Sequence, residues 1–330
     1  MKVIIPVAGM GTRLRPHTYS TPKTLLHVAG KPILAHILEP LTQLPGLSEL
    51  IFIVGDSGEQ IQRYVEANYN VPSVYVRQAE RKGLGHAISL AKERADGEPV
   101  IITLDDGILE FDCQQLIQRP YTVIGVKAVE NPNAFGIVEL EGEFITRLVE
   151  KPDVPPTNLA IAGLYYIKNS NLLFECLDDL IRKDIRTKGE YQLTDGLQLM
   201  LESGEKMQAA EINWLDCGKP EELLATNRYL LTRNCPPVGA HNAFIVPPVF
   251  IADEVSIENA VIGPHVSIGK GCRISNAIIK DSVVHPNAEV HNVLLSGSIV
   301  GDAAQIRGQF NTISVGSFSQ VDVDKAGVRD

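Results

Sequence analysis

The sequence predicts an α/β domain with a mostly parallel mixed sheet, followed by a second domain that forms a parallel β-helix. Three observations support this division. The chain has 330 residues, enough for two sizeable cores. Up to about residue 235, strand-like apolar runs alternate with helical patterns at the spacing of βαβ units. After residue 245 an internal repeat with a period of 16 or 17 residues takes over.

The elements of the first domain follow from hydrophobic periodicity. Strands are expected at Lys2–Val7, Leu50–Val54, Val74–Arg77, Pro99–Leu104 and Val123–Val126. Helices are expected at Ile33–Leu44, Gly58–Asn70 and Leu84–Arg94. An antiparallel pair is expected from Gly136–Leu140 and Thr146–Val149. This alternation predicts helices on both faces of one sheet.

The repeat in the second half aligns four segments, which begin at Ile251, Ile268, Val284 and Val300. Each segment begins and ends with Ile or Val six residues apart. One later position aligns residues that tolerate a left-handed backbone at a tight corner, namely Asn259, Asn276, Asn292 and Gly308. Inward aliphatic residues with such corners between them predict a parallel β-helix. A β-sandwich is the alternative, but its strands would not repeat in phase.

The expected boundaries are a first domain over residues 1–235, a linker over 236–245, the β-helix over 246–323 and a tail over 324–330. The linker follows from the run Cys235-Pro236-Pro237, because proline pairs interrupt regular structure.

The composition narrows the function classes. A net charge of −10 argues against a nucleic-acid partner held by bulk electrostatics, so a local group of cations predicts a small-anion site instead. No apolar run approaches the roughly 20 residues that cross a bilayer, which predicts no membrane span. The five cysteines are scattered without a CxxC pair, and the N-terminus lacks a signal-peptide pattern. These features predict a cytoplasmic protein with reduced thiols.

A group of cations follows the first expected strand. Gly9 and Gly11 let backbone N–H groups approach an anion because no Cβ intervenes, and Thr12 can donate a hydroxyl hydrogen bond. Arg13 offers a planar fork for phosphate oxygens, and Lys23 offers a point charge. The spacing fits neither a Walker A loop nor a GxGxxG dinucleotide loop.

The full string from residue 9, G-x-G-T-R-L-x-P-x-T-x-x-x-P-K-x-L, resembles the sugar-phosphate nucleotidylyltransferases. These enzymes join a nucleoside triphosphate to a sugar 1-phosphate and release pyrophosphate. The resemblance covers essentially the whole chain and implies a Rossmann-like catalytic domain with a left-handed β-helix after it. Many members carry a glycine where this chain has Ala8, and the bacterial UTP–glucose-1-phosphate uridylyltransferases carry an alanine there. The resemblance implies that the loop from Ala8 to Arg13 binds the nucleotide.

The same resemblance implies residues that bind the edge of the nucleobase. Gln78 follows an expected strand, and the GLGHA run that begins at Gly83 is similar to that of the uridylyltransferases. In the family the matching glutamine and glycine hold the edge of the base. A glutamine amide has a donor and an acceptor, which suits uracil or thymine. Without this context, Gln78 would be interpreted as a surface polar residue.

Two carboxylates lie on family motifs that hold Mg²⁺. Asp106 follows the strand-like run that ends at Leu104, and Asp216 lies in a stretch similar to the WxDxG motif. The resemblance implies that both bind one Mg²⁺, which as a hard cation takes oxygen ligands and neutralises phosphate charge. Asp105 replaces the usual glycine of the motif and is the alternative ligand to Asp106. Alternation along the chain predicts that Asp105 points away from Asp106.

The resemblance also assigns a sugar side. It implies that the Gly136 N–H and the Glu150 carboxylate bind the sugar, that Lys151 binds the sugar phosphate, and that Asn158 and Tyr165 contribute. Neighbouring side chains on a strand point to opposite faces, so Glu150 and Lys151 can share a site only if the strand ends or bends there. Tyr165 fits a core position equally well.

The resulting hypothesis is transfer of a nucleotidyl group from UTP or dTTP to a sugar 1-phosphate, with glucose 1-phosphate favoured. Two alternatives remain: a non-catalytic sugar-nucleotide-binding regulatory or scaffold protein, and a bifunctional enzyme with an acyltransferase site in the β-helix. The latter would use a histidine of the repeat region, where His265, His285 and His291 lie. A solvated face or an oligomerisation surface is the simpler interpretation of these histidines. Homo-oligomerisation through the β-helix is expected.

Overall fold

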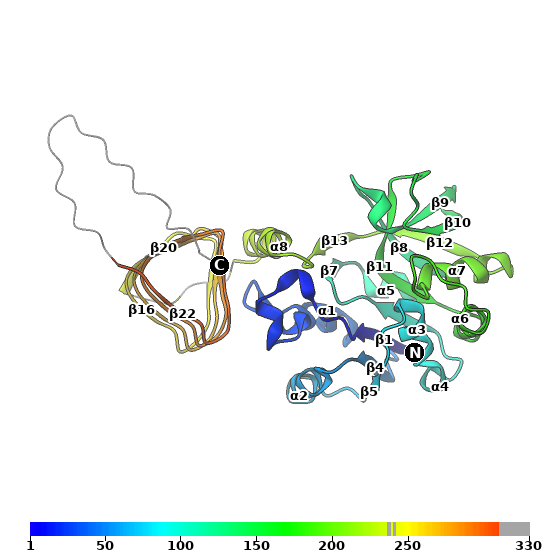
Figure 1. Cartoon of the computed structure of the whole chain (residues 1–330), viewed down its shortest axis with the longest axis horizontal. Coiled ribbons are helices and arrows are strands. Elements are labelled where there is room, and N and C mark those ends of the chain that lie inside the picture. The colour runs from blue at the N-terminus through cyan, green and yellow to red at the C-terminus, as the bar shows by residue number, and fades with distance from the viewer. Residues whose placement is uncertain (236–238, 240–241, 310–330) are drawn as a thin grey trace.

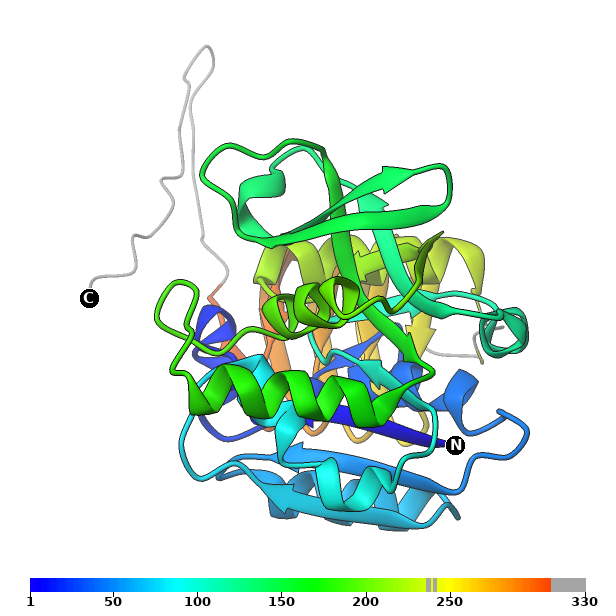
Figure 2. The same cartoon turned by 90° about the vertical axis from the view of Figure 1, so that its right-hand side faces the viewer.

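The computed structural model describes residues 1–235, 239 and 242–309. Figure 1 shows the first domain on the right and the β-helix on the left, with helix α8 (Pro220–Arg233) between them. Figure 2 looks onto the first domain with the β-helix behind it. No helix of the described part of the chain is long and apolar enough to span a membrane. The expected tail, residues 310–323 and the prolines of the expected linker lie outside the described residues.

The first domain contains a nine-stranded mixed sheet. Its strands are β1 (Lys2–Val7), β4 (Glu49–Val54), β5 (Ser73–Arg77), β6 (Val100–Thr103), β8 (Thr122–Ala128), β9 (Gly136–Glu141), β10 (Phe144–Glu150), β11 (Leu159–Ile167) and β12 (Met207–Glu211). They are arranged in the order β5-β4-β1-β6-β11-β8-β12-β10-β9. β5, β4, β1 and β6 are parallel, β11 is antiparallel to β6 and β8, and β9 pairs antiparallel with β10, as the sequence predicts for that pair.

Helices cover both faces of this sheet, as predicted. They are α1 (Ile33–Leu41), α2 (Gly58–Asn68), α3 (Leu84–Ser89), α4 (Lys92–Ala95), α5 (Cys113–Gln118), α6 (Ser170–Arg182) and α7 (Leu193–Glu202). Alternate residues of one strand enter different cores: Phe52 packs in the core that contains α1, α2 and α5, while Ile51 packs in the core that contains α3, α6 and α7. This alternation explains why β4 is apolar throughout.

Two short ribbons and four 3₁₀ turns lie in the loops outside the nine-stranded sheet. They are the ribbon β7 (Gly107–Glu110) with β13 (Asn213–Asp216), the ribbon β2 (His27–Val28) with β3 (Lys31–Pro32), and the 3₁₀ turns η1 (Thr12–Leu14), η2 (His17–Tyr19), η3 (Lys23–Leu25) and η4 (Pro132–Ala134). The helix expected over Leu84–Arg94 is divided into α3 and α4. The Ala91 N–H bonds the Ile88 carbonyl three residues back, at 2.9 Å, which tightens the turn and ends α3.

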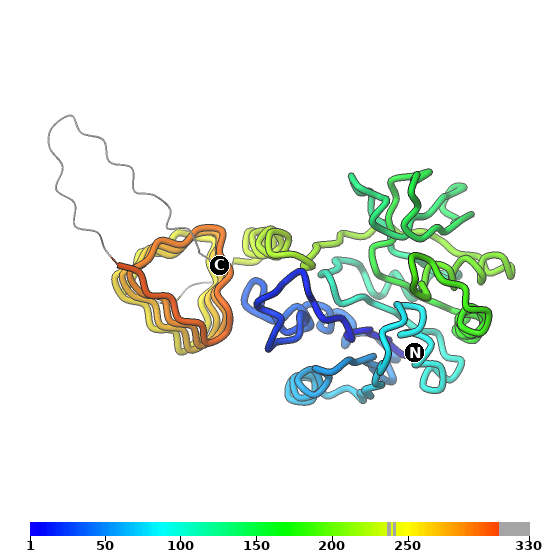
Figure 3. The backbone as a smooth tube through the Cα atoms, viewed as in Figure 1, coloured from blue at the N-terminus to red at the C-terminus, as the bar shows by residue number. Residues whose placement is uncertain are grey.

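The second domain is a β-helix, as predicted. One sheet stacks β14 (Asn242–Ile245), β16 (Ser256–Ile262), β18 (Arg273–Lys280), β20 (Glu289–Ser296) and β22 (Gln305–Arg307), all parallel. The other stacks β15 (Val249–Ile251), β17 (Val266–Ile268), β19 (Ser282–Val284) and β21 (Ile299–Val300). Figure 3 shows the coils superposed along their axis. β14 lies inside the expected linker, so the β-helix starts before residue 246, where the sequence predicted its beginning.

The asparagine corners behave as predicted. Asn259, Asn276 and Asn292 have φ values of 50°, 49° and 54°, in the left-handed region. The Asn276 amide accepts from Asn259 and donates to Asn292, so the corners form a hydrogen-bonded ladder. Gly308 does not have a left-handed φ. A Cβ there would lie 2.2 Å from the Asn292 carbonyl oxygen, so close packing between coils requires this glycine.

The two domains share a packed interface. The Asn227 side chain of α8 accepts from Ala29 N–H at 2.9 Å and from the Ser267 hydroxyl at 2.6 Å. Arg228 pairs with Asp281 of the β-helix at 2.5 Å. Val283 of β19 belongs to the apolar core of the first domain. These contacts fix the β-helix against α8 and the β2 segment.

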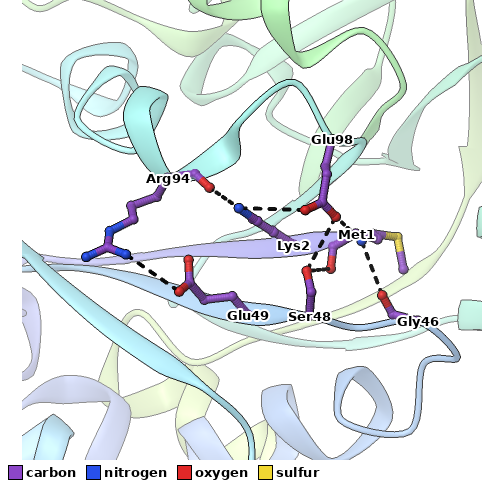
Figure 4. Close-up of polar contacts among 7 residues, drawn as sticks. All are labelled: Met1, Lys2, Gly46, Ser48, Glu49, Arg94 and Glu98. Carbon is purple, nitrogen blue, oxygen red and sulfur yellow. Dashed lines mark hydrogen bonds and ion pairs between the residues drawn. The ribbon is translucent and has the colours of Figure 1, made fainter.

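The start of the chain is held at the amino end of β1 (Figure 4). The Ser48 hydroxyl donates to the Met1 carbonyl at 3.0 Å, and the terminal amine pairs with Glu98. Arg94 and Glu49 approach to 3.9 Å beside them. The contacts join β1 to the segments that precede β4 and β6 and align the carboxyl ends of these strands at the opposite edge.

Candidate active site

Two adjoining cavities of 510 and 250 Å³ lie near the carboxyl ends of β1 and β6. Open α/β sheets bind ligands at this edge. The smaller cavity is lined by the expected nucleotide residues Ala8, Gly9, Gln78 and Gly83. The larger one is lined by Arg13, Gly136, Glu150, Lys151, Tyr165 and Asp216. Asp106 lines both cavities, so the two cavities adjoin at this carboxylate.

The loop after β1 is shaped by its glycines. Gly11 has a φ of 60°, and a Cβ there would lie 2.9 Å from Thr18 Cγ2. The Thr18 hydroxyl also donates to the Gly11 carbonyl at 2.8 Å, which ties the loop to η2. Gly9 has open space beside it, so a ligand can approach its backbone. Thr12 and Arg13 are exposed in η1.

Lys23 forms an ion pair that the sequence did not indicate. Its amine lies 3.2 Å from the Asp105 carboxylate, and the two side chains are 11% and 15% exposed. Burial alone would lower the pKa of Lys23, but Asp105 and Asp106 together hold it above its usual value. Burial raises the pKa of Asp105 against the opposing effect of Lys23. Asp105 is therefore a buried partner of a phosphate-binding candidate, and it also lines the smaller cavity beside Asp106.

Asp106 and Asp216 are brought together by the β7–β13 ribbon. Asp216 is in register with Gly107, and the Cys217 N–H donates to the Asp106 carbonyl at 2.9 Å. Burial raises the pKa of Asp216 to about 6; the Gly218 N–H opposes this shift, and the charges of Glu222 and Asp106 add to it. Two carboxylates that repel each other in one cavity suit a shared cation.

Arg13 lies beside the same carboxylate. Its charge lowers the pKa of Asp216, although burial outweighs it. A Cβ on Gly218 would lie 2.9 Å from Arg13 Nη2, so the glycine of the WLDCG stretch leaves room for the guanidinium.

The base-reading candidates lie together in the smaller cavity. Gln78 is 7% exposed, so it is not a surface polar residue. Its amide donates to the Gly83 carbonyl at 3.3 Å and contacts His86 Nδ1 at 3.1 Å. Gly83 has a φ of 110°, and a Cβ there would lie 2.5 Å from the Tyr191 carbonyl oxygen. The backbone of this loop therefore approaches the start of α7 closely.

On the sugar side, β10 ends at Glu150, and Lys151 adopts a φ of 40°. This reversal lets both side chains line one cavity, with Lys151 Nζ 3.3 Å from Glu150 Oε1. Thr194 donates to the other Glu150 oxygen at 2.6 Å. A Cβ on Gly136 would lie 2.7 Å from the Thr194 hydroxyl, so the glycine is required by packing.

The two weaker sugar-side candidates differ in position. Tyr165 is 3% exposed, so it packs in the core and also lines the larger cavity. Burial, with Glu150 and Asp106 nearby, raises the pKa of its phenol. Asn158 is exposed and lines neither cavity in the described part of the chain.

Several lining residues were not found from the sequence. Lys219 and Glu222 form a 2.8 Å ion pair at the start of α8 and line the larger cavity. Their position directly after the WLDCG stretch is a signal that could have identified them. Arg81 donates to the Ala8 carbonyl at 3.3 Å and lines the smaller cavity. It lies between Gln78 and Gly83, both already candidates.

Comparisons with known proteins agree with this geometry. A profile of the family described as Nucleotidyl transferase matches residues 2–233, and one described as GlmU-like, C-terminal hexapeptide matches residues 230–295. The chain is 35% identical to the low-salt glycan biosynthesis nucleotidyltransferase Agl11 of Haloferax volcanii over 70% of this chain and 66% of Agl11. It is 33% identical to the UTP–glucose-1-phosphate uridylyltransferase AglF of the same organism, over 67% of this chain and 93% of AglF.

A solved structure of UDP-glucose pyrophosphorylase complexed with UDP-glucose has the same fold. It superposes with a TM-score of 0.61 at 23% identity, covering 71% of this chain and 99% of that one. The match to Agl11 spans slightly less than two thirds of that relative. Fold and site together define a nucleotidyltransferase domain joined to a hexapeptide-repeat β-helix. The chain belongs to the sugar-1-phosphate nucleotidyltransferase family.

Proposed function

We propose that this protein is a cytoplasmic enzyme that transfers a nucleotidyl group from UTP or dTTP to a sugar 1-phosphate. Glucose 1-phosphate is the favoured acceptor, because the relative AglF is named for that sugar. One observation carries the proposal: the two cavities adjoin at Asp106, and the candidates for the two substrates are divided between them.

The roles of the residues follow from their positions. Gln78 and the Gly83 backbone read the pyrimidine edge in the smaller cavity. Arg13 and Lys23 hold the triphosphate, and Lys151 holds the sugar phosphate. Glu150 accepts from sugar hydroxyls beside the Gly136 backbone. The sugar-phosphate oxygen attacks the α-phosphorus in line and pyrophosphate leaves, so catalysis consists of positioning and charge neutralisation.

The donor set of Asp106 and Asp216 fits Mg²⁺. Both are carboxylates that line the larger cavity, and burial together with the charges of Glu222 and Asp106 raises the pKa of Asp216, so a cation in the cavity would offset this cost. A magnesium ion bound there would neutralise phosphate charge. The side chains of Asp106 and Asp216 would hold the ion, and the Gly218 N–H, which donates to Asp216 Oδ1 at 2.6 Å, orients that carboxylate.

Pyrophosphate release over a matrix of nucleoside triphosphates and sugar 1-phosphates tests the proposal. Turnover is expected with UTP or dTTP, whereas purine triphosphates should be poor substrates because they leave the polar groups around Gln78 unpaired. Comparable turnover with ATP or GTP would contradict the base assignment. Binding of sugar nucleotides without any pyrophosphate release would favour a regulatory protein of the same fold.

We also propose that the protein forms a homo-oligomer through its β-helix. Phe244, Val261, Ile278 and Leu294 align in register across β14, β16, β18 and β20. Phe244 and Leu294 are 69% and 74% exposed. A flat apolar ladder of this kind is self-complementary under two-fold symmetry, so a second copy of the chain is its proposed occupant.

A further inference from the structure

A third cavity, of 390 Å³, lies between the first domain and the β-helix. Residues from the 16–27 segment form one wall, and residues of the β-helix form the other. It shares no lining residue with the two active-site cavities. The reaction proposed above makes no use of it.

One imidazole that lines this cavity has a ring nitrogen without a hydrogen-bond partner among the described residues. His285 is 3% exposed, so it does not lie on the solvated face that the sequence favoured for the repeat histidines. Its Nδ1 accepts from the His27 backbone N–H at 3.4 Å, which places the ring proton of the neutral form on Nε2. Nε2 is buried and has no hydrogen-bond partner within residues 1–235, 239 and 242–309. A buried donor without an acceptor is costly, so the cavity is suited to a ligand that supplies one.

Two further imidazoles lie beside the His285 ring. The rings of His17 and His27 lie 6.3 and 6.1 Å from that of His285, and both residues line the cavity with Ser20 and Thr21. Burial lowers the pKa of all three imidazoles, that of His285 to about 3. The cavity therefore gathers neutral N–H and O–H donors.

The tautomer of His285 argues against a metal ion. A metal would need the lone pair of Nε2, which would move the ring proton to Nδ1 and set it against the His27 N–H donor. An oxyanion requires the proton to remain on Nε2, because it accepts hydrogen bonds from Nε2–H and from the other donors that line the cavity. It also supplies the counter-charge that lets His17 or His27 take up a proton.

We propose that this histidine cavity is a second ligand site, which binds a small phosphate-bearing anion. A phosphate group offers several strong acceptor oxygens to the N–H and O–H donors that line the cavity. The charged and titratable groups that face His285 are His17, His27 and, through His27, the Asp302 carboxylate. Asp302 also lines the cavity, and its negative charge limits the affinity.

The cavity wall also supports the loop that carries Arg13. His17 belongs to η2, whose Thr18 hydroxyl donates to the Gly11 carbonyl. Leu25 belongs to η3, which begins at Lys23. Given the proposed roles of Arg13 and Lys23, an anion bound here stabilises the loop that receives the triphosphate. Coupling is reciprocal, so a nucleoside triphosphate would change phosphate affinity by the factor by which phosphate changes that of the triphosphate.

Titration of the protein with inorganic phosphate, followed by the histidine ring resonances in NMR spectra, tests the site directly. The resonances of His17, His27 and His285 should shift, and that of His291, which lies elsewhere on β20, should not. In His285→Phe the affinity at this site, followed through His17 and His27, should fall at least about tenfold, because the ring volume is kept and the donor is lost. In Asp302→Asn it should rise severalfold. His291→Gln is the matched control.

Three outcomes would overturn the site. In the first, phosphate shifts the His291 resonance but not those of His17, His27 and His285. In the second, zinc ions perturb these three cavity histidines and phosphate does not. In the third, Asp302→Asn binds phosphate no more tightly than the native chain. The third outcome remains decisive if His285→Phe fails to fold. No nucleotide or sugar is needed, so these results are independent of the proposed reaction. The coupling is tested by nucleoside-triphosphate affinity with and without phosphate: a phosphate effect identical in the native chain and His285→Phe would refute it.

Discussion

At the scale of single residues, the ion pair of Lys23 with Asp105 changes the expected effect of a mutation. If Asp105 pointed away from the site, Asp105→Asn would be mild. Because the pair is buried, loss of the charge should destabilise the ligand-free protein by about 1–3 kcal/mol. The released amine should then bind phosphate oxygens more readily, so UTP should raise the melting temperature of the variant more than that of the native chain.

Thermal unfolding with and without UTP, in the presence of Mg²⁺, measures both effects. Asp253→Asn, at an exposed corner of the β-helix, is the control. Native stability and an unchanged response to UTP in Asp105→Asn would show that the Asp105 charge is not needed to balance Lys23.

A second prediction at this scale concerns Asp106 and Asp216. If both hold one cation that contributes about 3 kcal/mol to transition-state stabilisation, Asp106→Asn and Asp216→Asn should each lower kcat about a hundredfold. The double variant should be no worse than either single one, because all three lose the same ion. Steady-state kinetics with Mg²⁺ measures kcat, and circular dichroism checks folding. Losses that multiply in the double variant would mean that the two carboxylates act separately.

At the scale of elements, local sequence patterns predicted those features that depend on one strand or one turn alone. The argument that Glu150 and Lys151 share a site only where the strand ends is confirmed by the end of β10 and the positive φ of Lys151. The β7–β13 ribbon was not predictable in the same way. Its strands are four residues each and pair across about a hundred residues of chain, so no local periodicity reports the pairing.

Helix α1 supplies a prediction about pH. Burial lowers the pKa of His36 from 6.5 to about 4, against the opposing hydrogen bond from its Nε2 to the Val28 carbonyl. A histidine with a depressed folded-state pKa contributes stability above pH 6.5 that is lost as pH falls towards 4. His36→Gln keeps an amide donor for Val28 and cannot titrate. Between pH 6.5 and 4, the free energy of unfolding of this variant should therefore fall by up to about 3 kcal/mol less than that of the native chain.

Urea unfolding at pH 6.5, 5.5 and 4.5 measures this difference, with His291→Gln as the matched control. Native and His36→Gln curves that stay parallel across these pH values would show that His36 is not held neutral in the folded protein.

At the scale of the whole molecule, the sequence predicted two domains because each has its own repeat of hydrophobic spacing. The asparagines at the repeat corners predicted the β-helix, and three of the four corner residues have a left-handed φ, as expected. The contact between the domains was not predictable. Asn227 is one polar residue in a helix, yet it is 1% exposed and joins Ala29 to Ser267. Such a residue is indistinguishable from a solvated one until the partners from distant segments are known.

The interface also changes how assembly should be tested. Deleting the β-helix would expose the surface of α8 and the part of the first-domain core against which Val283 packs, so a changed oligomer would not identify the contact. Substitution on the exposed ladder avoids this difficulty. Ile278→Lys with Leu294→Lys places two charges at neighbouring ladder positions, while the inward-facing Ile279 remains untouched. If a second copy covers the ladder, burying these two charges should dissociate the oligomer.

Light scattering of the native chain and the Ile278→Lys/Leu294→Lys variant measures the assembly. The variant is expected to have a lower mass and to keep its melting temperature within a few degrees, because both side chains are exposed in the single chain. Asp253→Lys adds a charge at an exposed corner away from the ladder and should leave the mass unchanged. An oligomer that survives both ladder charges would place the contact on another surface. A monomeric native chain would refute assembly through the β-helix, and the ladder would then have to be explained by a different partner.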